Sequence, residues 1–69
     1  MADNTFEACK VINNELLPRA KFLRDSFCAL AEKARMDGAD VEAVPYDGAV
    51  LAMDDIIATA DKVMDLLER

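Results

Sequence analysis

Residues 5–35 read TFEACKVINNELLPRAKFLRDSFCALAEKAR, and this stretch decides the fold. Reading every seventh residue gives two mainly apolar columns: Phe6, Asn13, Ala20, Phe27 and Ala34, and beside them Cys9, Leu16, Leu23 and Leu30. Alternating steps of three and four residues between such columns are typical of a helix that packs lengthwise against other helices. We therefore predict a long helix over residues 5–36, with Asn13 as the one polar residue in its seam.

Pro18 is the one interruption within this predicted helix. Proline lacks a backbone N–H, and its ring crowds the carbonyl group four positions earlier, here that of Asn14. We expect a kink near Pro18, because the seven-residue columns continue in register on both sides of it. The alternative is a full break in which Asn14 caps a second helix, since proline is tolerated in a first helical turn.

The second half of the chain predicts a shorter helix that returns beside the first. Gly38 is expected to end the first helix in the left-handed conformation that glycine readily adopts. A connector over residues 37–47 and a helix over residues 48–67, capped by Asp47, follow. The seam of this second helix consists of Val50, Met53, Ile57, Ala60, Met64 and Leu67. The fold class is therefore all-α, an antiparallel helical hairpin formed by residues 1–69 as a single domain.

The unequal lengths of the two predicted helices indicate a homodimer. At about 1.5 Å per residue the first helix spans roughly 47 Å and the second roughly 30 Å, so the start of the first overhangs the hairpin. Aligning the helices about the connector pairs Arg24 with Asp61. A two-fold dimer with a four-helix arrangement would cover the apolar overhang. The predicted dimer contacts are Phe6, Cys9, Ile12, Asn13 and Leu16.

Composition and charge argue against several functional classes. The chain has no His, and Cys9 and Cys28 lie far apart on one predicted helix, so we expect no catalytic residues, metal or cofactor. Residues 37–69 carry nine acidic side chains against two basic ones, so direct binding of nucleic acid is not expected. Reduced cysteines and the lack of a signal peptide or an apolar membrane span predict a cytoplasmic protein without membrane contact.

Acidic residues on the second helix form the candidate partner-binding surface. Asp47, Asp54 and Asp61 recur every seven residues, although a solvated helix face is the simpler interpretation. Tyr46 is expected to be an exposed aromatic contact, because tyrosine is frequent at interface hot spots; the alternative is that it caps the hairpin end. Phe22 belongs to an apolar line that faces away from the seam, and it is a second candidate contact.

The segment TFEACKVINNELLPRA at residues 5–20, the Asp37–Gly38 turn and the acidic second helix resemble a small anti-activator protein of temperate Pseudomonas phages. The resemblance covers the full chain. It implies binding to a LuxR-type quorum-sensing regulator, whose activity is blocked, and inhibition of the type IV pilus assembly ATPase. It carries over no catalytic residues, because such proteins act by binding.

A small acidic helical dimer is also suited to masking a basic surface such as a helix-turn-helix DNA-binding domain. Two other functions are compatible with the same residues. One is inhibition of a different host system by a phage protein, for example an anti-CRISPR protein. The other is a structural dimerisation module of a larger bacterial complex.

Overall fold

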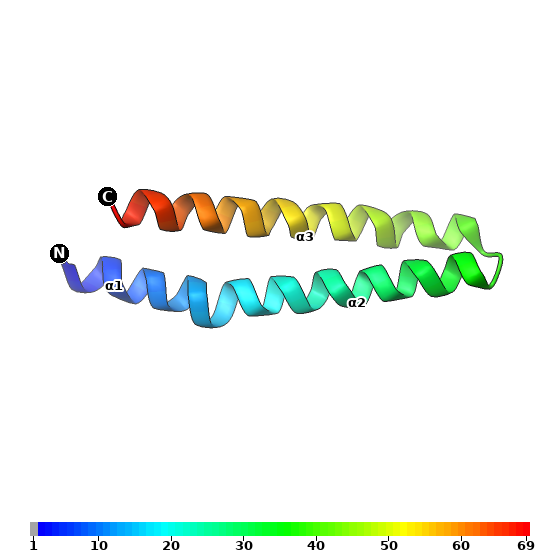
Figure 1. Ribbon diagram of the computed structural model, residues 1–69, viewed down its shortest axis with the longest axis horizontal. Coiled ribbons are helices and arrows are strands. Elements are labelled where there is room, and N and C mark those ends of the chain that lie inside the picture. The colour runs from blue at the N-terminus through cyan, green and yellow to red at the C-terminus, as the bar shows by residue number, and fades with distance from the viewer. Residues whose placement is uncertain (1) are drawn as a thin grey trace.

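The computed structural model describes residues 2–69, with side chains from Asn4 onward. Its elements are α1 (Ala2–Val11), the π-helical turn η1 (Ile12–Leu16), α2 (Leu17–Met36) and α3 (Asp40–Leu67). The first three follow one another without a break, and α3 returns antiparallel beside them, so that both chain ends lie at one end of the rod (Figure 1). The predicted all-α helical hairpin is therefore confirmed.

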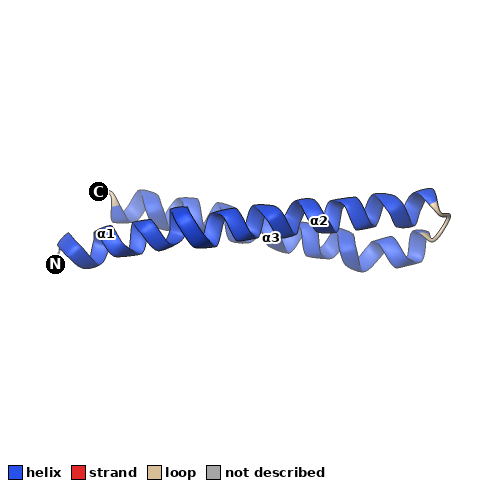
Figure 2. Cartoon of the chain, turned by 90° about the horizontal axis from the view of Figure 1, so that it is seen from below, coloured by secondary structure: helices blue, strands red, loops and turns tan. Residues whose placement is uncertain are grey.

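The hairpin is a thin rod. Its Cα atoms extend over 54 × 16 × 11 Å, and their radius of gyration is 15.6 Å. A compact domain of this length has a radius of about 11 Å. Figure 2 shows that the two arms stay alongside each other and cross at a shallow angle, as lengthwise-packed helices do. Much of the surface of each helix is therefore left uncovered.

Small side chains form the contact between the two arms. Among residues 4–69 the buried ones are Leu17, Ala20, Ala31, Ala34, Ala43 and Ala60. Methyl groups let the helix backbones approach closely, but each removes little apolar area from water. Larger apolar residues consequently lie at the margins of the contact or on the outer faces, and thirteen of them within the described residues are exposed.

The seam predicted for the second helix is confirmed, but the helix begins earlier than predicted. All six seam residues from Val50 to Leu67 are buried or half-buried. The same spacing continues backwards through Tyr46, Ala43 and Ala39, so the helix starts at Asp40. The prediction of a connector over residues 37–47 and of a cap at Asp47 was therefore wrong, since the connector comprises residues 37–39 alone.

Pro45 lies inside α3, within the range that was predicted to be the connector. It has no N–H to donate to the carbonyl group of Val41, which lies in the first helical turn. The Val41 residue is 84% exposed, so that carbonyl is within reach of water. Asp40 and Glu42 lie in the same turn, where acidic side chains interact favourably with the positive end of the helix. The accessibility of the Val41 carbonyl group to water and the favourable charges of Asp40 and Glu42 together let the helix continue through Pro45.

Gly38 closes the first arm as predicted. Its φ is +79°, and the N–H groups of Gly38 and Ala39 donate to the carbonyl groups of Arg35 and Ala34 at 3.1 and 2.8 Å. This pair of hydrogen bonds is a Schellman cap, which satisfies carbonyl groups that the end of a helix leaves without partners. Ala39 packs against the buried Ala34, so the turn and the core are formed by the same residues.

The irregularity at Pro18 is a π-helical turn. The backbone stays helical from Ala2 to Met36, so a full break at Asn14 is excluded. The N–H of Leu17 donates to the carbonyl group of Ile12, five residues back, which inserts one extra residue just ahead of the proline. Between residues 9 and 20 the side chains that are not exposed are accordingly those of Cys9, Ile12, Leu17 and Ala20. The step from Ile12 to Leu17, across the turn, is five residues. The prediction that the columns keep one register across Pro18 was wrong for this reason.

The predicted overhang of the first helix is also much smaller than expected. The first arm has 35 residues and α3 has 28, a difference of roughly 10 Å at about 1.5 Å per residue. Most of α1 therefore lies beside the end of α3, and only its beginning extends past that end (Figure 1).

Replacing Gly38 by Ala should lower the free energy of unfolding by about 1 kcal/mol, because a Cβ atom is strained at positive φ. Urea unfolding followed by circular dichroism at a fixed protein concentration measures this change. Gly48→Ala is the matched control, since Gly48 lies inside α3 at negative φ and its replacement should not destabilise the chain. An unchanged unfolding midpoint for Gly38→Ala would contradict the role given to this cap.

Candidate interaction surfaces

One long side of the rod carries ion pairs between the arms, and we call it the charged side. Arg35 donates to both carboxylate oxygens of Asp47, with Nη1–Oδ distances of 2.9 and 3.0 Å. This hydrogen bond and the charge of Asp47 raise the pKa of the Arg35 guanidinium. Nearer the middle, Nη1 of Arg24 lies 3.7 Å from Oδ1 of Asp54.

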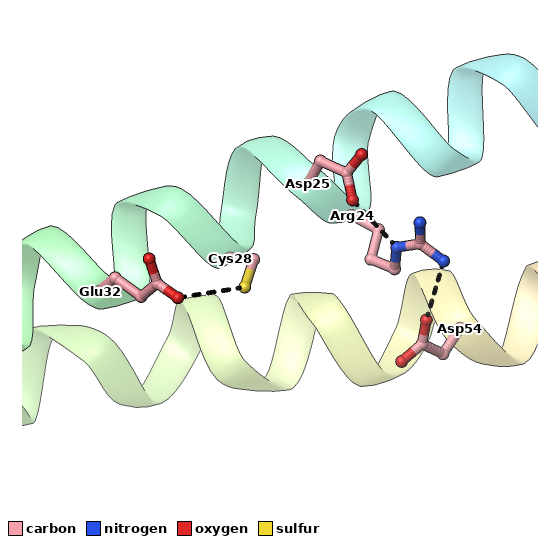
Figure 3. A network of polar contacts seen from close by, with 5 residues as sticks. All are labelled: Arg24, Asp25, Cys28, Glu32 and Asp54. Carbon is pink, nitrogen blue, oxygen red and sulfur yellow. Dashed lines mark hydrogen bonds and ion pairs between the residues drawn. The ribbon is translucent and has the colours of Figure 1, made fainter.

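Figure 3 shows how Arg24 lies between its two partners. Its Nε atom donates to Oδ1 of Asp25 at 3.2 Å, while Nη1 reaches across to Asp54 on the other arm. The predicted pair with Asp61 was wrong, because the shorter connector places residues from earlier in α3 opposite Arg24. Such a solvent-exposed pair contributes at most about 1 kcal/mol.

Tyr46 is part of the hairpin core. It is half-buried, and its ring stacks on that of Phe27 with centroids 6.3 Å apart and an interplanar angle of 26°. It also packs against the cluster of Ala31, Ala34 and Ala43. The expectation of an exposed aromatic contact was therefore wrong, and the alternative of a cap over the hairpin end describes its place. Its position in the seam four residues before Val50 was the signal for this.

The three predicted acidic contacts differ in their surroundings. Asp47 and Asp54 are engaged by Arg35 and Arg24, whereas Asp61 is exposed and forms no ion pair within residues 4–69. Further acids with no ion pair in that range are Glu32, Asp37, Asp40, Glu42, Asp55 and Glu68, most of them at the hairpin turn or on the second arm. The uncompensated negative charge is therefore concentrated at the hairpin tip and along α3.

The opposite long side is apolar, and we call it the leucine side. It consists of Leu16, Leu23 and Leu30 from the first arm and Ile56 and Val63 from α3, each between 39% and 43% exposed. Leu16 meets α3 in an open groove of about 310 Å³, lined by Ile12, Leu16, Asp55, Ile56, Thr59, Ala60 and Val63. The leucines recur every seven residues. They lie at the margin of the contact between the arms, because the buried alanines occupy its centre.

The predicted dimer contacts do not gather on one surface. Ile12 and Leu16 line the groove of the leucine side, and Cys9 is half-buried towards α3. Phe6 is 63% exposed, with Nζ of Lys10 lying 5.6 Å from the centre of its ring. Asn13 is exposed within η1, so it does not interrupt the seam as predicted.

Phe22 lies on the outer face of α2, as expected from its place in the sequence. It is 69% exposed and borders a shallow groove with Pro18, Arg19 and Leu23. The groove belongs to a single helix and has no buried polar side chain. Phe22 thus remains available for a contact.

Replacing Tyr46 by Ala should lower the free energy of unfolding by about 2 kcal/mol, because it removes a ring packed on Phe27 and the alanine cluster. Tyr46→Phe keeps the ring and should change stability little. Thermal unfolding of the two variants at equal concentration provides the comparison. Equal stability of Tyr46→Ala and wild type would contradict the packing described here.

Candidate metal ligands do not cluster in the part of the chain that the structure describes. No three Cys, Asp or Glu side chains within the described residues lie close enough together to hold a metal ion, and Cys28 has Glu32 as its neighbour at 4.0 Å (Figure 3). None of the described helices is both long and apolar enough to cross a membrane. Comparison with protein-family models, with curated proteins and with solved structures finds no match to the chain.

Proposed function

We propose that this chain is a non-enzymatic phage inhibitor that acts by binding host proteins in the bacterial cytoplasm. It blocks a LuxR-type quorum-sensing activator by covering its DNA-binding surface, and it inhibits the type IV pilus assembly ATPase. The observation that carries the proposal is the charge of the hairpin turn and α3, where seven acidic side chains and no basic one lie between Arg35 and Lys62. The resemblance of residues 5–20 to the phage anti-activators supports the choice of partners.

The acidic side chains of α3 would increase the rate at which the chain associates with the regulator. A DNA-reading domain is basic because it contacts phosphates, and an acidic surface attracts it over about a Debye length, roughly 10 Å at 0.1 M salt. Asp47 and Asp54 contribute less to this field, since Arg35 and Arg24 compensate their charge. Asp55 and Asp61, together with the acids of the tip, carry the attraction.

A homodimer built on the leucine side is part of this proposal. One protomer exposes 5098 Å², whereas a compact monomer of 7.6 kDa exposes about 4,300 Å². The excess of about 800 Å² matches what one partner buries in a standard interface. Two hairpins facing each other on this side form a four-helix arrangement and cover Leu16, Leu23, Leu30, Ile56 and Val63. The same side would serve a structural dimerisation module, which differs in binding no regulator.

Sedimentation velocity at micromolar concentration should give a species of about twice the 7.6 kDa chain mass, because the leucine side is covered by a second copy. Leu23→Asp should shift it to the monomer, and Leu23→Ser provides a milder variant if the aspartate unfolds the chain. Leu66→Asp is the control, since Leu66 is exposed on α3 but lies outside the leucine side. A wild-type chain that sediments only as a monomer would refute the dimer.

Wild-type chain should bind the purified DNA-binding domain of a LuxR-type regulator and release it from operator DNA. The association rate should fall steeply between 0.05 and 0.5 M salt, values chosen because the Debye length drops from about 14 to about 4 Å over that range. Asp55→Asn with Asp61→Asn should slow association further.

The control for this experiment is Glu7→Gln with Glu15→Gln, which changes the net charge equally but on the first arm. This variant should associate nearly as fast as wild type. A wild-type chain that binds neither the regulator nor the pilus ATPase would overturn the proposed function. Binding that does not respond to salt would remove the electrostatic part alone.

A further inference from the structure

The outer face of α3 carries an apolar stripe that the hairpin does not use. Val41, Val44 and Leu51 are 84%, 65% and 66% exposed. Together with Gly48 they follow each other at steps of three, four and three residues, so they form one line about 15 Å long on the helix. Each lies two positions from a seam residue, which is about 200° around the helix. We call these four residues the outer stripe.

Gly48 in the middle of this stripe has no role inside the hairpin. It lies in the interior of α3, where glycine is less favourable than alanine. A Cβ atom at this position would meet nothing within 4 Å, and the backbone has no positive φ to require glycine. A contact made by another molecule with the backbone at this point would account for the missing side chain.

The charges around the outer stripe restrict what can bind there. Asp37 and Asp40 lie at its beginning, and Asp55 lies one turn beyond Leu51 at its end. The nearest basic residue before the stripe, Arg35, already binds Asp47. Two copies of the stripe facing each other would bring these acids together, so a second copy of the chain is disfavoured. A partner with basic groups around an apolar surface is favoured.

We propose that the outer stripe docks into an apolar groove on a protein partner whose rim carries lysine and arginine side chains. An amphipathic helix lying in a groove uses anchors at this spacing, and here Val41, Val44 and Leu51 supply them while Gly48 admits close approach of the groove wall. The inference rests on the proposed function, which makes the DNA-binding domain of the LuxR-type regulator the partner. It assigns the anchoring contact to residues other than Tyr46 and Asp47.

The outer stripe and the leucine side are separate surfaces. Ile56 and Val63 project from α3 about a quarter turn away from the line through Val41, Gly48 and Leu51. A dimer formed through the leucine side therefore leaves both of its outer stripes uncovered. A dimeric regulator would meet two stripes on one inhibitor dimer, which strengthens binding without new contacts.

The test measures binding of the purified regulator DNA-binding domain to Leu51→Ser, Gly48→Ala and Leu66→Ser. Leu51→Ser should weaken binding about tenfold, because it removes an anchor. Gly48→Ala should raise the midpoint of thermal unfolding and yet weaken binding about fivefold, a combination that a purely structural role does not produce. Leu66 is the matched control, because it is a leucine of α3 that is 55% exposed and lies beyond the stripe.

Each outcome of this experiment decides the inference. Weaker binding by the two stripe variants, with Leu66→Ser near wild type, supports it. Wild-type affinity for Leu51→Ser and Gly48→Ala overturns it and leaves the proposed function intact. A changed oligomeric state of Leu51→Ser in sedimentation assigns the stripe to a contact between copies, and also overturns it. Failure of the wild-type chain to bind the regulator overturns the proposed function and this inference with it.

Discussion

The close approach of two helices through alanine is the constraint on which the rest of the structure depends. Ala20, Ala31 and Ala34 of the first arm and Ala43 and Ala60 of α3 are buried along the rod, and Leu17 is the one larger side chain among the described residues that is buried with them. Side chains of this size leave little room for larger ones between the arms, so even Phe27 and Tyr46, which stack on each other there, stay half-buried. The larger apolar residues are therefore displaced to the leucine side and the outer faces, so the packing that forms the hairpin also determines which surfaces can bind.

Sequence periodicity predicted the architecture well where the apolar repeat was unbroken. The seam from Val50 to Leu67 was predicted residue by residue. Apolar residues at alternating steps of three and four line one face of a helix, and that face packs against the neighbouring helix. The start of α3 was missed, because the second helix was predicted to be capped by Asp47 and the small Ala39 and Ala43 gave a weak apolar signal. The misplaced pair of Arg24 with Asp61 follows from that error, because a partner across a hairpin depends on where the turn lies.

The candidate surfaces were less predictable than the fold. Helical spacing predicts which residues share a face of a helix. It does not predict whether that face contacts the other arm or is exposed to solvent. Tyr46 belongs to the seam, and Asp47 and Asp54 are compensated by arginines whose position only the paired structure reveals. The overall excess of acid on the second half was visible in the sequence, since net charge does not depend on register.

The π-helical turn decides which side of α1 faces its neighbour. If the seam of Leu17 and Ala20 were continued backwards in steady heptads, Lys10 and Asn13 would turn inward with Phe6. Burying an ammonium and an unpaired amide against alanine would be unfavourable. The extra residue rotates α1 by about 100° about its own axis, so Cys9 and Ile12 turn inward while Lys10 and Asn13 stay hydrated. One inserted residue thus shifts the helical register, so that the polar side chains of this segment stay exposed while the apolar seam continues along α1.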